Sequence, residues 1–186
     1  YFEYNGIRQS NRNRLLWRDP AVDGLKTGHT DEAGFCLAAS AKREDMRLVA
    51  VVMGTRSDSA RAQETQKLLA YGFRYFETHK VRSAADKLGD HRVWLGTSNS
   101  VEVGLQSDLN LTIPRGMQGE LTLDMEMEEY PLAPIEVGQV IGKLVVSKDG
   151  EVLEERPLIA RTAVEESGFI GRLIGHIQLV IAKLLG

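Results

Sequence analysis

Hydrophobic and polar residues along the first 80 positions follow the pattern of a mixed α and β region. Two apolar runs, Phe35 to Ala41 and Arg47 to Met53, are joined by a short polar stretch, which predicts an antiparallel hairpin. After a group of small polar residues, apolar side chains recur at helical spacing: Ala62, Leu69, Phe73 and Phe76. This spacing predicts a helix that begins near Ser57, a residue type that caps helices.

From about residue 90 to 165 the pattern changes to short strands. The strictest alternation lies at Leu121 to Met127, where apolar and polar side chains fall on opposite faces. Four more strands are predicted: Val101 to Leu105, Leu109 to Ile113, Val140 to Val146 and Val152 to Ile159. The dipeptide Asp149-Gly150 is a hairpin turn between the last two. Strands at this spacing predict an all-β sandwich domain, with His79 to Asp90 as the linker before it.

The last segment, residues 168–186, is a predicted amphipathic helix. At about 100° per residue, its large aliphatic side chains fall in one arc of roughly 160°. Arg172, His176 and Lys183 cluster on the opposite side, and Leu179 is the one large apolar residue beside them. The charged stripe favours a helix that lies in the plane of a membrane surface. The alternative is an ordinary amphipathic helix that docks on its own protein.

Composition excludes several classes of function. The chain has 186 residues, 42% of them hydrophobic, which suits one large or two small globular domains. Its net charge of −3 argues against nucleic-acid binding. The four histidines are scattered without metal-ligand spacing, so no metal site is expected, and no glycine loop indicates a nucleotide cofactor. The single cysteine, Cys36, lies in an apolar strand and is expected to be a core residue.

Lys26-Thr27-Gly28 is the stretch with the clearest chemical meaning. Lys-Thr-Gly is one of three elements of the penicillin-recognising serine acyl-transferases, together with Ser-x-x-Lys and Ser-x-Asn. In such a strand the lysine attracts a substrate carboxylate, the threonine hydroxyl binds it, and the glycine leaves room for substrate. The next backbone N–H, that of His29, can then point at a developing oxyanion. Any strand that enters a hairpin can also contain these three residues by chance.

The surrounding motifs decide between these interpretations. In chain order they are Asn11-Arg12-Asn13, Leu15-Leu16-Trp17, Val22 to Thr30, Ala33-Gly34, Met53 to Arg56, Leu111 to Gly116 and Ala133-Pro134-Ile135. This series closely resembles the latter half of the low-molecular-mass penicillin-binding proteins of the D-alanyl-D-alanine carboxypeptidase family. The resemblance covers essentially the whole chain, including the amphipathic tail that finishes at Gly186.

The resemblance implies a fold and a location. Residues 1–80 would be the C-terminal half of an α/β catalytic domain of the transpeptidase and β-lactamase type. Residues 90–165 would be the family's β-rich C-terminal domain, and residues 168–186 a membrane-anchor helix. The family implies a periplasmic protein, attached peripherally to the inner membrane through that helix.

The resemblance also implies an activity, the removal of the terminal D-alanine from peptidoglycan stem peptides through a serine acyl-enzyme that β-lactams also form. Lys26, Thr27 and Gly28 carry over as substrate-binding residues, and the His29 backbone as the oxyanion donor. Arg12 and Arg61 match family arginines that would neutralise the terminal carboxylate.

Neither Ser-x-x-Lys nor Ser-x-Asn occurs in the 186 residues. We therefore expect a fragment of a longer protein, inactive by itself and unable to form a penicillin adduct. The alternative is a non-catalytic, membrane-tethered β-domain module that binds partners or peptidoglycan. A β-lactamase is a third interpretation, which the β domain and the anchor disfavour.

Overall fold

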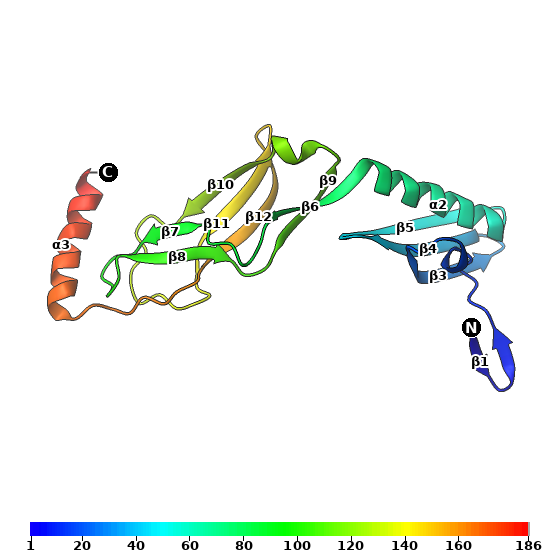
Figure 1. Ribbon diagram of the computed structural model, residues 1–186, viewed down its shortest axis with the longest axis horizontal. Helices are drawn as coiled ribbons and strands as arrows, with labels where there is room; N and C mark the ends of the chain where they lie inside the picture. The colour runs from blue at the N-terminus through cyan, green and yellow to red at the C-terminus, as the bar shows by residue number, and fades with distance from the viewer. Residues whose placement is uncertain (186) are drawn as a thin grey trace. The chain divides into compact units, whose positions relative to one another are not determined.

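The computed structural model describes residues 1–185, apart from the side chains of Phe2 and Leu185. Gly186, the predicted last residue of the C-terminal helix, lies outside the described residues. The described chain is mostly β-sheet with a C-terminal helix, as Figure 1 shows. It divides into two compact units, the first made of Tyr1–Thr78 and Thr112–Arg115, the second of His79–Leu111 and the rest from Gly116.

The first unit contains an antiparallel sheet in the order β3-β4-β5. These strands are β3 (Val22–Thr30), β4 (Gly34–Arg43) and β5 (Met46–Thr55). β4 and β5 confirm the predicted hairpin, and its tight turn places Glu44 at a φ of 52°. β4 and β5 are runs of consecutive apolar residues, and because successive side chains of a strand point to opposite faces, one apolar face of the sheet can pack against a helix.

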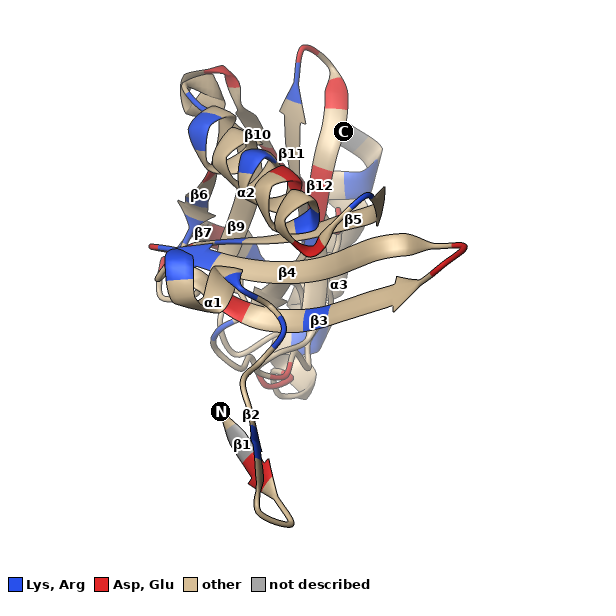
Figure 2. Ribbon diagram, turned by 90° about the vertical axis from the view of Figure 1, so that its right-hand side faces the viewer, with Lys and Arg blue, Asp and Glu red and all other residues tan. Residues whose placement is uncertain are grey.

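That helix is α2 (Asp58–Tyr75), which lies across the sheet in Figure 2. It begins where the sequence predicts, because the Ser57 side chain accepts a hydrogen bond from the backbone N–H of Ala60 at 3.1 Å. Three of its predicted apolar positions are buried against the sheet: Ala62, Leu69 and Phe73. The core between helix and sheet is completed mainly by Leu15, Val22, Leu37, Ala39, Ala41, Met46 and Ala50.

The two faces of the sheet differ. Leu25 of β3, Ala39 of β4 and Ala50 of β5 are in register across the sheet, and they lie on the face toward α2. Ala39 and Ala50 are buried there. The next set, with Lys26, Ala38 and Val51 in register, lies on the other side. There α2 gives no cover, and β5 exposes the apolar side chains of Val49, Val51 and Met53.

Short elements precede the sheet. They are the paired strands β1 (Phe2–Tyr4) and β2 (Ile7–Gln9) and the single-turn helix α1 (Leu15–Arg18). Such short elements give too little periodicity to be seen in a sequence. Leu15 is fully buried in the core of the first unit, so α1 is fixed by this one side chain.

Gly34 opens β4 at a close approach of two strands. It has a φ of +63°, and a Cβ there would lie 2.9 Å from the backbone oxygen of Thr55. Gly54 has a similar φ of +72° but nothing within 4 Å of a Cβ. We expect G54A to cost about 1 kcal/mol of stability from strain alone, and G34A about 1–3 kcal/mol more, because backbone must move. Thermal unfolding measures the loss of stability in each variant, and equal losses for G54A and G34A would contradict this prediction.

The second unit is built on a five-stranded antiparallel sheet in the order β10-β11-β12-β8-β7. The strands are β7 (Gly89–Arg92), β8 (Ser100–Leu105), β10 (Thr122–Met127), β11 (Val140–Lys148) and β12 (Glu151–Ala160). Four of them, and β9 (Leu109–Pro114), confirm predicted strands. Asp149 and Gly150, both at positive φ, form the predicted turn. A short 3₁₀ helix, η1 (Met117–Glu120), joins β9 to β10.

The core of this unit combines the sheet with segments outside it. Its buried residues are Val81, Val93, Val101, Val103, Leu105, Leu109, Ala133, Ile135, Ile141, Leu144, Val146, Leu158, Ala160 and Val164. Strand β6 (Phe76–Arg82) and the first two residues of β7 overlap the segment predicted as a linker, so that prediction is wrong for His79 to Arg82 and for Gly89 and Asp90. β6 pairs with β9 in a two-stranded sheet. Its sequence was misleading because Val81 is the only residue of the strand that is buried.

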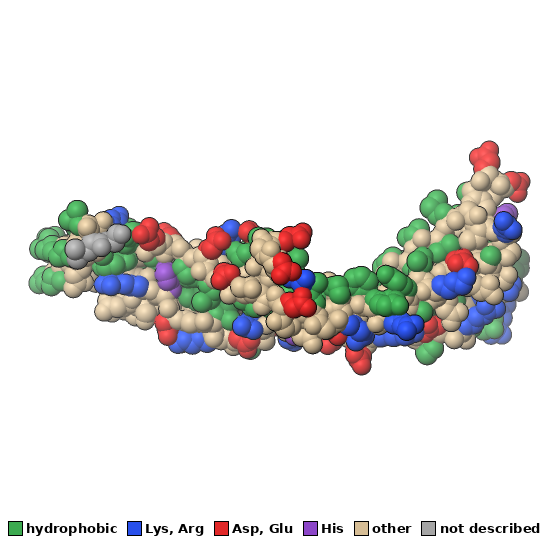
Figure 3. Space-filling model, turned by 90° about the horizontal axis from the view of Figure 1, so that it is seen from above, with side chains coloured by type: hydrophobic (Ala, Val, Ile, Leu, Met, Phe, Trp, Pro, Cys, Tyr) green, Lys and Arg blue, Asp and Glu red, His purple; other side chains and the backbone are tan. Residues whose placement is uncertain are grey.

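Helix α3 (Phe169–Leu185) follows. It packs on its own unit with the side opposite its aliphatic arc, as a Cβ added to Gly175 would meet Leu95 at 2.8 Å. Leu179, the apolar residue among the charges, is only 7% exposed, because it lies on the face of the helix that packs on the unit. The aliphatic face of α3 is exposed, and Figure 3 shows hydrophobic side chains (green) gathered on this helix. This face consists of Phe169, Ile170, Leu173, Ile174, Ile177, Val180, Ile181 and Leu184.

Two charges on α3 have partners in the same unit. Arg172 pairs with Glu166 at 3.2 Å, and the Lys183 ammonium lies over the Tyr130 ring at 5.1 Å. The Ser167 hydroxyl, just before the helix, donates to the carbonyl oxygen of Leu95 at 3.0 Å. Among the residues described, no helix has the length and apolar character that a membrane crossing needs.

Candidate active site

A large open cavity lies in the first unit, beside the Lys-Thr-Gly strand. Its volume is about 1220 Å³. Its lining comes from the N-terminal residues, the segment through α1, strands β3 and β4, and the start of α2: Tyr1, Gln9, Ser10, Asn11, Arg12, Arg14, Trp17, Arg18, Leu25, Lys26, Thr27, Gly28, His29, Phe35, Asp58 and Arg61. All six residues predicted to bind substrate or form the oxyanion donor line this one cavity: Arg12, Lys26, Thr27, Gly28, His29 and Arg61.

The Lys-Thr-Gly residues lie on β3, which is an edge strand of its sheet. Lys26 is exposed, and its ammonium donates to the carbonyl oxygen of Thr27 at 2.5 Å. Gly28 pairs with Cys36, and a Cβ on Gly28 would meet that side chain only at 3.8 Å, an ordinary contact. Packing within the described chain therefore does not require a glycine at this position.

The start of β3 is tied by side chains to both other strands of its sheet. Arg47 of β5 donates to the Asp23 carboxylate at 2.9 Å and also to the hydroxyl of Ser40 on β4. The Arg47 guanidinium, followed by the Ser40 hydroxyl, holds the pKa of Asp23 below its ordinary value. These contacts fix the strand that presents Lys26.

The segment before α1 is held against β3 by Asn13, which sequence reasoning missed as a key residue. It is 1% exposed; its amide nitrogen donates to the Gly24 carbonyl at 2.9 Å. Its amide oxygen accepts from the backbone N–H of Leu15 at 3.1 Å. An asparagine two residues before an apolar helix start is a recognisable signal for such a turn. By this contact Asn13 places the neighbouring Arg12 and Arg14 at the cavity wall.

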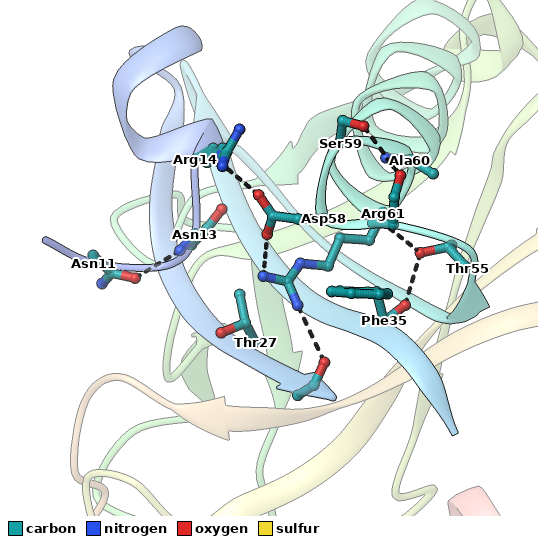
Figure 4. Close-up of polar contacts among 12 residues, drawn as sticks. Asn11, Asn13, Arg14, Thr27, Phe35, Thr55, Asp58, Ser59, Ala60 and Arg61 are labelled. Carbon is teal, nitrogen blue, oxygen red and sulfur yellow. Dashed lines mark hydrogen bonds and ion pairs between the residues drawn. The ribbon is translucent and has the colours of Figure 1, made fainter. Parts of the chain in front are cut away.

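Arg61 is a buried residue of the cavity lining, and Figure 4 shows its contact with Asp58. It comes from the first turn of α2 and is 5% exposed. Its guanidinium binds the Asp58 carboxylate and donates to the carbonyl oxygen of Gly28 at 3.2 Å. Asp58 in turn pairs with Arg14 at 2.6 Å. Sequence reasoning missed the pair of Arg14 and Asp58, because these two residues lie far apart along the chain.

The rings of His29 and Phe35 also line the cavity beside Arg61. The Phe35 ring lies 5.6 Å from the Arg61 guanidinium carbon and 3.9 Å from the His29 ring. The hydroxyl of Thr55 donates to the Phe35 carbonyl at 2.8 Å, which holds β4 in place beneath them. His29 is thus packed by its ring, while its backbone belongs to β3.

The cavity favours an anionic ligand. Five of its lining residues are cations, namely Arg12, Arg14, Arg18, Lys26 and Arg61, against the single carboxylate of Asp58. This local excess contrasts with the net charge of −3 for the whole chain. Among the described residues, no group of three or more His, Cys, Asp or Glu side chains is placed to hold a metal ion. A positive cavity of this kind can bind a carboxylate and stabilise a developing oxyanion.

Comparison with known proteins identifies the class to which this fold and site belong. Residues 1–57 match the sequence profile of the D-alanyl-D-alanine carboxypeptidases, and residues 76–166 match that of the penicillin-binding protein 5 C-terminal domain. The chain belongs to the D-alanyl-D-alanine carboxypeptidase family of penicillin-binding proteins.

Individual relatives are similar over the whole chain. D-alanyl-D-alanine carboxypeptidase DacA of Escherichia coli is 41% identical over 100% of this chain and 46% of its own length. DacC of the same organism is 42% identical, over 100% of this chain and 47% of its own. The crystal structure of penicillin-binding protein 5 from Haemophilus influenzae has a TM-score of 0.79 and 43% identity, and it covers 89% of this chain and 49% of that one. The chain therefore spans about half the length of these relatives.

Proposed function

We propose that this chain is the C-terminal portion of a serine-type D-alanyl-D-alanine carboxypeptidase. The observation that carries the proposal is the cationic cavity along Lys26-Thr27-Gly28, in a chain whose first 57 residues match that family's profile. The relatives' names describe the same activity. The serine and its general base would lie in the portion of the relatives that this chain does not span.

In the proposed reaction, a serine hydroxyl attacks the carbonyl carbon of the terminal D-alanyl-D-alanine peptide bond of a stem peptide. The C–N bond breaks, the leaving amine takes a proton, and D-alanine departs from an ester acyl-enzyme. Water then hydrolyses the ester, restoring the serine and releasing the shortened peptide. A β-lactam would acylate the same serine through its ring amide.

Each cavity residue has a role in this proposal. Lys26 supplies the cation that draws the terminal carboxylate to the strand, and the Thr27 hydroxyl binds it. Gly28 lets the peptide lie along β3, and the His29 backbone N–H stabilises the oxyanion. Arg12, which lines the cavity and is exposed, adds positive charge for the carboxylate. Arg61 lines the same cavity and is engaged by Asp58 and the Gly28 carbonyl.

We further propose that the first unit is one part of an α/β transpeptidase-type domain. The support is the sheet face that carries Lys26, where Val49, Val51 and Met53 are exposed on β5. An apolar face beside Lys26, a proposed substrate-binding residue, is suited to pack against the segment that bears the nucleophile.

Helix α3 is proposed to attach the protein to the periplasmic side of the inner membrane. It exposes eight large apolar side chains on one face and docks on its own unit with the opposite face. A helix with this arrangement buries its apolar face at the boundary between headgroups and acyl chains.

Labelling with a fluorescent penicillin tests the activity. We expect the full-length protein that contains this chain to form a stoichiometric adduct, visible on a gel and by intact mass, and this chain alone to form none. Adduct on this chain would show that the nucleophile lies within it. No adduct on either would favour the alternative, a membrane-tethered β-domain module without catalysis.

A further inference from the structure

The contacts of Arg61 are unusual for a residue that binds a substrate carboxylate. Its side chain is 6% exposed, and its nitrogens are engaged by Asp58 and the Gly28 carbonyl. Its guanidinium also faces the Phe35 ring. Arg12, in contrast, is exposed at the cavity wall and has no hydrogen bond or ion pair within the described part of the chain. The two arginines therefore suit different tasks.

The carbonyl that Arg61 binds belongs to a peptide group with a special position. The Gly28 C=O and the His29 N–H are the two ends of one planar peptide, and that peptide is trans. The two bonds point in opposite directions across it. Arg61 therefore holds the far end of the group whose N–H is the proposed oxyanion donor.

A cation at the carbonyl end changes the donor in two ways. A charge-assisted hydrogen bond is about twice as strong as a neutral one, so it fixes the orientation of the peptide plane. It also draws electron density toward the carbonyl oxygen, which makes the N–H at the other end a stronger donor. Both effects act on a developing oxyanion and leave the ground-state binding of a carboxylate unchanged.

The positive charge is kept in place by its neighbours. Asp58 pairs with both Arg61 and Arg14, so the three groups together retain one net positive charge. Asp58 lies at the first residue of α2, where its carboxylate also suits the helix N-terminus. The carboxylate therefore orients the guanidinium without cancelling the charge of the cluster.

We propose that Arg61 is a positioning residue that orients and polarises the Gly28–His29 peptide of the oxyanion hole, and that Asp58 and Arg14 hold it for this purpose. The inference rests on the proposed acyl-transfer function. It departs from the sequence-based expectation that Arg61 neutralises the substrate carboxylate, and the two roles affect different kinetic constants.

The test is the acylation of the full-length protein by benzylpenicillin, with the dissociation constant Ks and the acylation rate constant k2 measured separately. For R61Q we expect k2 to fall about 10- to 100-fold, less than the loss of an oxyanion donor itself, with Ks changed less than about threefold. R61K, which keeps a cation near the Gly28 carbonyl, is expected to recover part of k2. R12Q is expected to raise Ks instead.

R56Q is the matched control, since Arg56 is an exposed arginine just before α2 that does not line the cavity. Its k2 and Ks should equal those of the unchanged protein. If R61Q does not fold, D58N decides, because it loosens Arg61 while retaining its charge; k2 should fall while Ks does not rise, since removing the one carboxylate of the cavity does not weaken the binding of an anion.

A spectroscopic readout separates positioning from a general loss of structure. The infrared stretch of the acyl-enzyme ester carbonyl falls in frequency as the oxyanion hole binds it more strongly, so R61Q should shift it upward and R56Q should not. A raised Ks with unchanged k2, or an unshifted carbonyl band in R61Q, would overturn the proposal. Failure of the unchanged protein to acylate would instead overturn the proposed function.

Discussion

Replacing Lys26 with alanine in the full-length protein is expected to slow acylation by benzylpenicillin about 100- to 1,000-fold, the scale seen when an electrostatic group is removed from an active site. Lys26 is exposed in the cavity, and its one hydrogen bond is to the carbonyl of its neighbour Thr27. Its charge is therefore free to act on a bound carboxylate and on groups that titrate beside it.

The effect should be confined to chemistry and binding. Because Lys26 is exposed on an edge strand and its one hydrogen bond is to the neighbouring Thr27 carbonyl, the fold of this unit does not depend on its side chain, and K26A should unfold at nearly the same temperature as the unchanged protein. K42A is the matched control, since Lys42 is an exposed lysine on β4 that does not line the cavity. Equal acylation rates for K26A and the unchanged protein would remove the central support for the proposed site.

Replacing Ile177 and Ile181 together with glutamate is expected to release the protein from lipid vesicles. Both side chains lie on the open face of α3, 56% and 50% exposed. Burying an isoleucine in an apolar environment contributes about 1.5–3 kcal/mol, so losing two weakens partition by about 3–6 kcal/mol, or on the order of 10²- to 10⁴-fold. Sedimentation with vesicles that contain anionic lipid measures this change.

The face of α3 that packs on its own unit also determines how vesicle binding should depend on salt. Arg172 and Lys183 are engaged by Glu166 and Tyr130, so their attraction to anionic lipid is reduced and binding should depend only weakly on salt. I177E and Q178E make a matched pair, because they add the same charge at adjacent positions and only the first lies on the apolar face. Equal sedimentation of this pair, or no release of the double variant, would refute the anchor.

Much of the local structure follows from the sequence alone, for physical reasons. The hairpin of β4 and β5, the Ser57 cap of α2 and the Asp149-Gly150 turn depend on residues close together in the chain. Strand β6 was missed because its burial depends on distant partners, and only Val81 signals it. The amphipathic pattern likewise predicted α3, but only the structure shows that Gly175 and Leu179 lie on the face that packs on its own unit.

The candidate active site also combines features that the sequence predicts with contacts that only the tertiary structure reveals. The sequence by itself predicted the Lys-Thr-Gly strand, Arg12 and Arg61 beside it, and the family, because these follow from short motifs, whereas Arg14 and Arg18 were not predicted. Only the tertiary structure decided that Arg61 turns inward to the Gly28 carbonyl and that Asp58 and Arg14 hold it there. A hydrogen bond between residues 33 positions apart arises when a helix packs beside a strand edge, and no local pattern of residue types encodes that contact.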